Sequence, residues 1–265
     1  LADGLVPTKS GAGYWIAFAD GTVRAFGDAA SVGLPPIRLA APVVGIATSW
    51  ASSSGFALPL LEFARALANA PGSQRTWVGP HEVALTFDDG PGADTPSVLA
   101  VLALDNVPAT FFTVGYLAAT RADLLAAEAN AGMSVEDHSW DHPDLTRLSI
   151  PAIDDELTRA ANAIQAGIGR RPTCFRPPYG STNSTVAAEG AKLGLAQILW
   201  NVDPSDYLQP GATVIAARVL AAGTGRGLVV GLHDGGGDRS QTVAALPAII
   251  EGLRARGYTF VRLCA

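Results

Sequence analysis

The sequence predicts an α/β fold in which helices cover a parallel sheet, preceded by a small β-rich module. From Glu82 onward, short apolar runs alternate with longer segments that carry apolar residues at helical spacing. Polar, turn-rich clusters directly follow several of the apolar runs. Residues 1–80 have a different texture, with hairpin signals and a linker. The sheet is either doubly wound or closed as a barrel, and both arrangements bind ligands at the C-terminal ends of the strands.

Composition narrows the classes of function. The 265 residues suffice for one large domain with its own core and a smaller appendage. Apolar residues make up 48% and charged residues 16%, which favours a compact globular chain over a disordered one. No run approaches the roughly 18 apolar residues of a membrane helix. The net charge of -6 comes without basic clusters, so we expect a neutral substrate and neither nucleic acid nor a membrane span.

The N-terminal 80 residues predict a β-module and a linker. Gly13–Ala17 and Val23–Phe26 are expected to be strands joined by a turn at Ala19–Thr22. Ser54–Leu58 resembles the start of a second copy, and a period of about 40 residues is typical of propeller repeats. Such repeats are similar to those found beside cell-wall enzymes of actinobacteria, whereas an ordinary hairpin is the alternative.

A short helix-like run at residues 61–67 leads into the linker signal Pro71-Gly72-Ser73. We therefore place the domain boundary near Gly79-Pro80, with residues 1–80 as the module and 81–265 as the main domain.

The main domain predicts seven strands and six helices. The expected strands are Val83–Phe87, Ala109–Val114, Met133–Glu136, Cys174–Arg176, Ala196–Trp200, Leu228–Leu232 and Tyr258–Leu263. The expected helices are Pro96–Leu104, Ala122–Ala131, Ile153–Ile168, Asn183–Leu193, Val214–Ala222 and Thr242–Arg256.

Five polar clusters follow strands of this set: DDGP, EDHSWDH, RPPYG, VDPSDY and HDGGGD. One edge of the sheet therefore gathers them. In the first cluster, Asp88 and Asp89 are adjacent, so they face opposite ways unless the strand has already broken. Gly90 and Pro91 favour that break. Gly235–Gly237 lacks the spacing of a phosphate-binding loop and is expected to be flexible.

The titratable residues of these clusters form a hydrolytic set. His138 and His142 are spaced i, i+4, as on one side of a helical turn, and with a carboxylate they suit an open metal site. If Asp89 is the third ligand, Asp88 is free to act as general base. Arg176 could hold that base, and His233 could act as general acid with Asp206 or Asp203 as its partner; these expectations follow from chemistry alone.

The five clusters, in this order, resemble the NodB-like polysaccharide deacetylases of carbohydrate esterase family four, over about residues 82–263. The resemblance implies a distorted, incomplete (β/α) barrel. It implies the roles of base for Asp88, base-positioning arginine for Arg176, and general acid for His233, tuned by Asp206. The implied metal ligands are Asp89, His138 and His142, and the main-chain N–H of Tyr179 is implied as an oxyanion donor. The implied substrate contacts come from Tyr179, Tyr207, Leu232 and Trp140.

The resemblance also implies the reaction. We expect removal of N-acetyl groups from N-acetylglucosamine residues of chitin, chito-oligosaccharides or peptidoglycan, with a divalent ion as cofactor, zinc first and cobalt or nickel as alternatives. An acetylxylan esterase and a glycan-binding protein without turnover are the other readings. Because the chain begins at Leu1 without a targeting segment, we expect a mature, secreted or wall-associated monomer.

Three features depart from the family or stay open. Tyr207 stands where the family usually has Trp, and Glu136-Asp137 stands where Gly-Asn is commoner, which adds acidic groups near the metal. Cys174 and Cys264 are either a disulfide or two free thiols; the resemblance favours the disulfide slightly.

Overall fold

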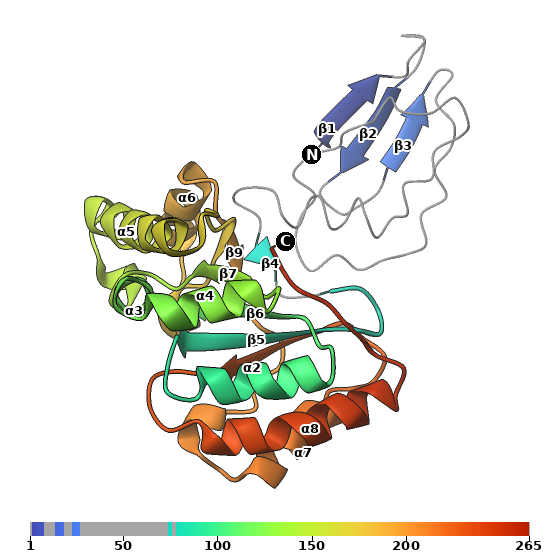
Figure 1. The fold of residues 1–265 in the computed structure, drawn as a ribbon. Helices are drawn as coiled ribbons and strands as arrows, with labels where there is room; N and C mark the ends of the chain where they lie inside the picture. Colours follow the sequence, from blue (N-terminus) through green and yellow to red (C-terminus); the bar gives the residue numbers. More distant parts are fainter. Residues whose placement is uncertain (1, 8–13, 19–22, 27–73, 76–77, 265) are drawn as a thin grey trace. The chain divides into compact units, whose positions relative to one another are not determined.

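The computed structural model describes residues 2–7, 14–18, 23–26, 74–75 and 78–264 (Figure 1). The chain divides into two compact units, Leu1–Ala57 and Leu58–Ala265. This division falls before the boundary expected after residue 80. Since residues 27–73 lie outside the described ones, the boundary stays a prediction, and so do the second repeat copy at residues 54–58 and the short helix at residues 61–67.

The first unit contains a three-stranded antiparallel sheet in the order β1 (Ala2–Pro7), β2 (Tyr14–Phe18) and β3 (Val23–Phe26). The β2–β3 pair confirms the two strands expected from the sequence. The sequence did not predict β1, because its Gly4 and Pro7 are residues that strands usually avoid.

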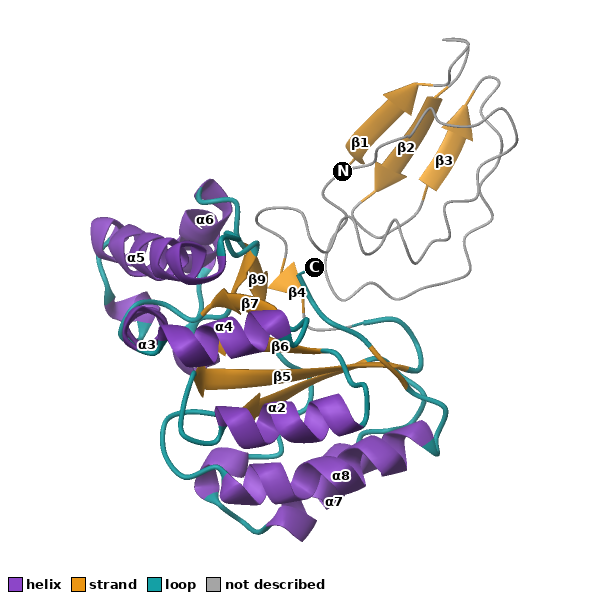
Figure 2. Cartoon of the chain, in the orientation of Figure 1, coloured by secondary structure: helices purple, strands orange, loops and turns teal. Residues whose placement is uncertain are grey.

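The second unit is a curled parallel sheet covered by helices (Figures 1 and 2). Its strands are β4 (Gln74–Arg75), β5 (Glu82–Gly90), β6 (Ala109–Thr113), β7 (Ser134–Asp137), β8 (Cys174–Phe175), β9 (Ala196–Ile198), β10 (Leu228–His233) and β11 (Thr259–Phe260). Its α-helices are α2 (Thr95–Leu104), α3 (Gly115–Thr120), α4 (Ala122–Asn130), α5 (Ile150–Ile168), α6 (Ser184–Lys192), α7 (Ala212–Ala221) and α8 (Ser240–Arg254). Short 3-10 turns lie at Leu145–Arg147, Pro178–Gly180 and Asp206–Leu208.

The strand order is β10-β5-β6-β7-β8-β9-β4, with β11 also beside β5, and every pairing is parallel. Beyond β9, Val202 bridges to Val230 of β10, so the two sides of the sheet approach each other. The fold is therefore the distorted, incomplete (β/α) barrel that the resemblance implied. Among the described residues, no helix is both long and apolar enough to cross a bilayer.

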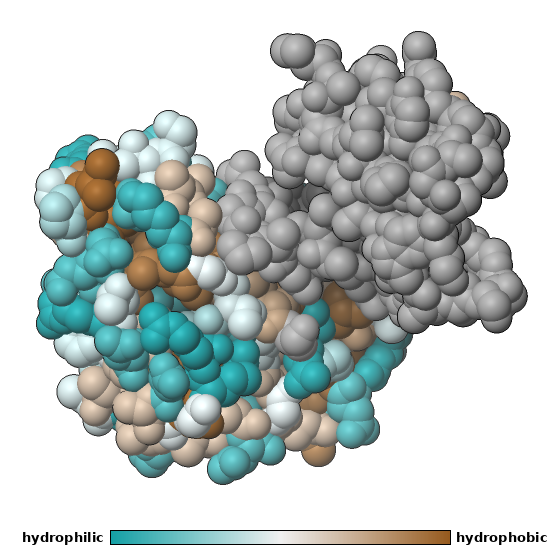
Figure 3. All heavy atoms as spheres, turned by 90° about the horizontal axis from the view of Figure 1, so that it is seen from above, coloured by the Kyte–Doolittle hydropathy of each residue, from teal (hydrophilic) through white to brown (hydrophobic). Residues whose placement is uncertain are grey.

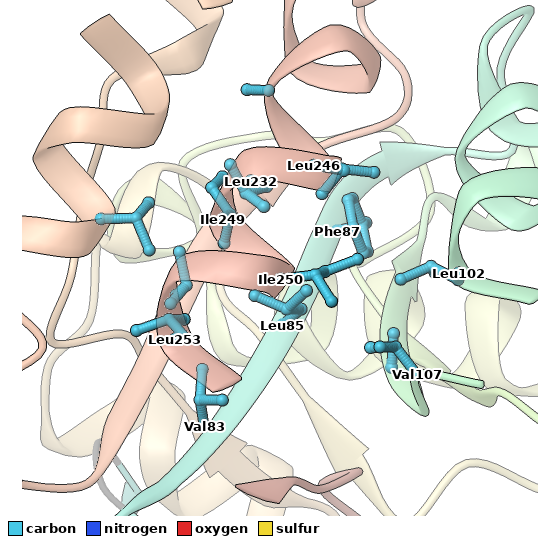
Figure 4. Packing of buried hydrophobic residues seen from close by; sticks show 14 of the residues in the cluster. Val83, Leu85, Phe87, Leu102, Val107, Leu232, Leu246, Ile249, Ile250 and Leu253 are labelled. Atoms are coloured by element: carbon cyan, nitrogen blue, oxygen red, sulfur yellow. The ribbon is translucent and has the colours of Figure 1, made fainter. Parts of the chain in front are cut away.

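Strand β5 shows how the sheet separates two packing layers. Its odd-numbered residues Val83, Leu85 and Phe87 pack outward against α8 and α2 (Figure 4). Ala84 belongs instead to a cluster drawn from strands and terminal segments, with none of its described members on a helix. The even-numbered side chains of β5 therefore face the concave interior. Small residues on that side leave room for a large polar side chain from another strand.

The C-terminal segment ties together the strand ends opposite the five polar clusters. The main-chain O of Cys264 accepts hydrogen bonds from Ser134 (3.3 Å) and Thr173 (3.0 Å), near the starts of β7 and β8. Cys174 and Cys264 form a disulfide with a Cα–Cα distance of 5.9 Å. The alternative of free thiols is thus wrong for this structure.

On the face shown in Figure 3, hydrophilic and apolar residues are interspersed.

Candidate active site

The two adjacent carboxylates of the first cluster are separated by a break at the end of β5. The pairing with β6 shifts register between Asp88 and Gly90, and Asp89 has a φ of 69°. Such a bulge turns one side chain away from the strand's alternation. Asp88 keeps its inward direction and is buried, whereas Asp89 turns toward the loop that follows β7. The expected difference between the two aspartates is therefore built into the backbone.

Asp89, His138 and His142 lie together at this edge of the sheet. The Nε2 atoms of His138 and His142 are 3.4 and 3.1 Å from Oδ1 of Asp89. The i, i+4 spacing was taken to suit a helical turn, and that part of the reasoning is wrong. Residues 138–142 form a loop in which Ser139 and His142 have φ values of 63° and 66°. The loop, not a helix, brings the two rings together.

The donor chemistry of this trio fits a cation. Nδ1 of His138 lies 2.7 Å from the main-chain O of Arg176, which can only accept, so Nδ1 carries the hydrogen. The other ring nitrogen, Nε2, faces Oδ1 of Asp89 at 3.4 Å. That Oδ1 is buried and has no hydrogen-bond partner among the described residues. The three ligand atoms lie within 4.8 Å of one another, so these residues could hold a metal ion.

The charge state of Asp89 agrees with this chemistry. Burial raises the pKa of Asp89, but the two adjacent imidazoles outweigh burial and hold it well below its usual range. The carboxylate is ionised at neutral pH, as a ligand must be.

The two acids that precede His138 are both fully buried. Burial raises the pKa of Glu136 and, more strongly, that of Asp137. The Glu136 carboxyl group accepts from the main-chain N–H groups of Thr173 and Cys174 at 2.8 and 2.9 Å, at the start of β8. Glu136 is thus engaged with the neighbouring strand, and its Oε1 also pairs with Arg170 at 3.1 Å.

Asp88 and Arg176 form a buried ion pair inside the curled sheet. Nη1 of Arg176 donates to Oδ1 of Asp88 at 2.6 Å, and the two side chains are 0% and 6% exposed. Nη1 also donates to Thr86 at 2.7 Å. The guanidinium lies 4.1 Å from the ring centre of Phe112, which belongs to the interior cluster. The arginine therefore holds Asp88 in one orientation in a dry environment.

His233 and Asp206 form the second ion pair of the site. Nδ1 of His233 lies 2.7 Å from Oδ1 of Asp206, and the other oxygen, Oδ2, accepts from the main-chain N–H of His233 (2.9 Å) and from Thr242 (2.7 Å). Burial lowers the pKa of His233, but Asp206 outweighs burial and raises it overall. Asp203, the other acid considered, accepts instead from the main-chain N–H of Ser205 and is exposed. Asp206 is therefore the acid that pairs with His233.

The four predicted substrate contacts occupy different environments. The Tyr179 ring is 68% exposed and lies 4.6 Å from that of His142, and Tyr207 is 47% exposed and lies 5.6 Å from His233. The Trp140 ring packs under the guanidinium of Arg159 at 4.2 Å. Leu232 is fully buried in the core layer of Figure 4. Both Tyr side chains border the site, and substrate contacts by all four residues stay predictions.

Three residues that contribute to the site had no motif role in the sequence. Thr86 and Thr242 each hydrogen-bond to one ion pair, and a threonine carries no pattern that singles it out. Trp200 lies 5.4 Å from the Arg176 guanidinium, and its ring is so close to Gly231 that a Cβ there would lie 3.1 Å from it. The Gly231–Trp200 juxtaposition could not be predicted because Trp200 lies after β9, far along the chain from Gly231 on β10.

Comparisons with known proteins agree with this geometry. The family model described as polysaccharide deacetylase matches residues 77–198. The chitooligosaccharide deacetylase of Bradyrhizobium sp. (strain ANU 289) is 41% identical over 193 residues, 68% of this chain and 88% of that protein. The peptidoglycan-N-acetylglucosamine deacetylase PgdA of Listeria monocytogenes is 38% identical, with 68% of this chain and 38% of that protein covered.

Two further similarities bear on substrate and fold. The bifunctional xylanase/xylan deacetylase of Cellvibrio japonicus is 37% identical over 176 residues, 66% of this chain and 26% of that protein. The solved structure of a family 4 carbohydrate esterase from Streptomyces lividans in complex with acetate is similar with a TM-score of 0.64 and 38% identity. That match covers 68% of this chain and 91% of the other.

Proposed function

The chain belongs to the polysaccharide deacetylase family, and on that premise we propose that Asp88 and His233 are its general base and general acid in removing N-acetyl groups from N-acetylglucosamine residues of a glycan. The chitooligosaccharide and peptidoglycan deacetylases among its relatives support this substrate class. The observation that carries the proposal is the pair of groups next to the Asp89 trio, an arginine-held carboxylate and a carboxylate-held imidazole, which lie in register on the neighbouring strands β5 and β10.

Asp89, His138 and His142 would hold the divalent ion, with zinc first and cobalt or nickel as alternatives. When bound, such an ion polarises the acetyl carbonyl and acidifies water. The main-chain N–H of Tyr179 is proposed as a second donor to the developing oxyanion, since Tyr179 lies beside His142.

Asp88 accepts the proton of the attacking water. Arg176 orients this carboxylate, because it donates to one oxygen and is itself hydrogen-bonded to Thr86. The tetrahedral intermediate then collapses and the C–N bond breaks. Nε2 of His233 gives its proton to the leaving amine, while Asp206 stabilises the imidazolium through Nδ1.

Tyr207 lies against His233 and is proposed as a wall of the acetyl site. An acetyl ester of xylan is the second candidate substrate, because a xylan deacetylase is among the relatives and ester and amide share one kind of tetrahedral intermediate. Since the glycans named by the relatives include peptidoglycan, we propose a secreted or wall-associated monomer.

The test is acetate release from chito-oligosaccharides, peptidoglycan and acetylxylan, compared between the wild type, Asp88→Asn and the exposed control Asp154→Asn. We expect Asp88→Asn to lose acetate release and keep its metal content, measured by elemental analysis, and Asp154→Asn to match the wild type. Full activity in Asp88→Asn would contradict the assignment of the base. Release from acetylxylan alone would favour the esterase, and binding of glycans without any release would favour a protein without turnover.

A further inference from the structure

A cavity of about 520 Å³ opens beside Asp89. One wall is the start of α3 with Tyr116, Leu117 and Arg121, and the other is the loop Gly235–Asp238. Its volume lies within the range of roughly 300–1,000 Å³ that is usual for small-molecule sites. The catalytic groups described above leave this space unused, although Asp89 lines it.

The α3 wall is fixed to the loop that carries the two histidines. The main-chain N–H groups of Gly115 and Tyr116 donate to the carbonyls of Ser139 and Trp140 at 2.9 and 3.0 Å. Tyr116 is 44% exposed, so part of its ring is open to solvent. The main chain at Tyr116 is therefore fixed relative to the loop that carries His138 and His142.

The glycine wall, which the sequence predicts to be flexible, accepts hydrogen bonds from a buried arginine. Nε of Arg239 donates to the carbonyl of Gly235 at 2.7 Å, and Nη2 donates to that of Gly236 at 3.0 Å. The main-chain N–H of Arg239 donates to the Asp94 carboxylate at 2.7 Å, on the floor of the cavity. Arg239 is 6% exposed, and its guanidinium donates hydrogen bonds to main-chain carbonyls of the loop.

Glycine is required in this wall for two reasons. Gly236 has a φ of 72°, and a Cβ there would lie 2.7 Å from Oδ2 of Asp89. A side chain would thus press on the proposed metal ligand and fill the cavity. This wall therefore presents main-chain atoms to a ligand in the cavity, and Tyr116 lies on the opposite wall.

This combination suits a sugar ring. An aromatic face packs against the C–H surface of a pyranose, while hydroxyl groups at its rim need donors and acceptors. The lining supplies both, through the Arg121 guanidinium, the Asp94 and Asp238 carboxylates and the loop backbone. We propose that the cavity binds the sugar residue next to the one being deacetylated, with Tyr116 as its stacking face and Arg239 as the positioning residue of the opposite wall.

This inference rests on the proposed function and concerns glycan length. Asp89 belongs both to the trio and to the cavity lining, so a glycan seated with its acetyl group at the trio continues between Tyr116 and the loop. Tyr116 contributes to substrate binding and touches no reacting atom. Its removal is therefore expected to act on KM and to spare kcat.

The experiment compares wild type, Tyr116→Ala, Tyr116→Phe and Arg239→Met, with Leu104→Ala as control because Leu104 is 85% exposed and outside the cavity lining. Acetate release is measured on chito-oligosaccharides from two to six residues. For Tyr116→Ala we expect KM for the tetramer to rise by about tenfold, the equivalent of about 1.4 kcal/mol, with kcat nearly unchanged. Tyr116→Phe and Leu104→Ala should match the wild type.

Arg239→Met should raise KM in the same way, because the loop loses its clamp. Wild-type KM values at every length in Tyr116→Ala, alongside normal wild-type activity, would overturn the sugar subsite and leave the proposed function standing. Calorimetric binding of chitotetraose to Asp88→Asn, with and without Tyr116→Ala, tests the cavity independently of turnover. We expect about tenfold weaker binding in the double variant; equal Kd values would also overturn the subsite.

Discussion

Replacing Arg176 by Met tests the buried ion pair that holds the proposed base. The substitution keeps most of the side-chain volume but removes the donors to Asp88 and Thr86. Both partners of the pair are almost fully buried, at 0% and 6% exposure, so solvent screening gives little relief. Breaking such a pair by removing one partner typically costs about 3–5 kcal/mol, because a charge is left buried without compensation.

That loss corresponds to a fall in Tm of about 6–20 °C for a unit of this size. Urea denaturation and thermal unfolding measure it, with Arg147→Met as control, since Arg147 is 84% exposed in its pair with Asp144. The double variant Asp88→Asn, Arg176→Met removes both charges and should recover part of the lost stability. A wild-type Tm in Arg176→Met, or no recovery in the double variant, would refute the reasoning from a buried charge.

Three other predictions concern pH and covalent structure. Asp206→Asn should move the alkaline limb of the pH–rate profile to lower pH, because the carboxylate raises the pKa of His233; an unmoved limb would argue against His233 as the acid. Glu128 is fully buried with neither carboxyl oxygen hydrogen-bonded among the described residues, and burial raises its pKa well above its ordinary value. The stability that protonated Glu128 contributes is therefore fully present below pH 4.5 and is lost as the pH rises toward the folded-state pKa. Urea titrations should show that the free energy of unfolding of Glu128→Gln falls less between pH 5 and 8 than that of the wild type. Parallel plots of unfolding free energy against pH for the two proteins would contradict this. Replacing Cys174 and Cys264 by Ser should lower the free energy of unfolding by about 4–5 kcal/mol, because the disulfide closes a loop with a sequence separation of 90; a reduced wild type as stable as the oxidised one would rule out the bridge.

Much of the architecture could be predicted because it depends on local periodicity. Strands buried on both sides appear as continuous apolar runs, and the helices between them carry their apolar residues at helical spacing. Every strand expected in the main domain is present, with ends that differ by a few residues; β11 is the shortest relative to its prediction. The five polar clusters gather at one edge because all the pairings are parallel.

Short elements were missed for a physical reason. Helix α3 has six residues, too few for an amphipathic pattern, and it begins at Gly115, a poor helix former. It is stabilised by hydrogen bonds to Ser139 and Trp140, which lie over twenty residues later in the chain. Strand β4 has two residues and exists only through its pairing with β9. No local signal reports such long-range partners.

The roles proposed for the site residues show the same division. The order of motifs identified the candidate base, acid and ligands, because their residue types and positions after strands follow from the sequence itself. Residue types alone left open whether Asp203 or Asp206 partners the histidine, a choice that the family resemblance made for Asp206, and the sequence left open whether the cysteines are joined. It also assigned His138 and His142 to a helical turn that does not exist.

The sequence by itself determined the parallel α/β class, the family and the set of residues that can do hydrolytic chemistry, since these depend on periodicity and residue type. Tertiary structure alone decided how those residues act on one another. The bulge at Asp89 separates it from Asp88, the C-terminal segment brings Cys264 to Cys174, and Arg239 holds the glycine loop against a cavity. Each of these depends on distances between residues far apart in the chain, which only the packed fold sets.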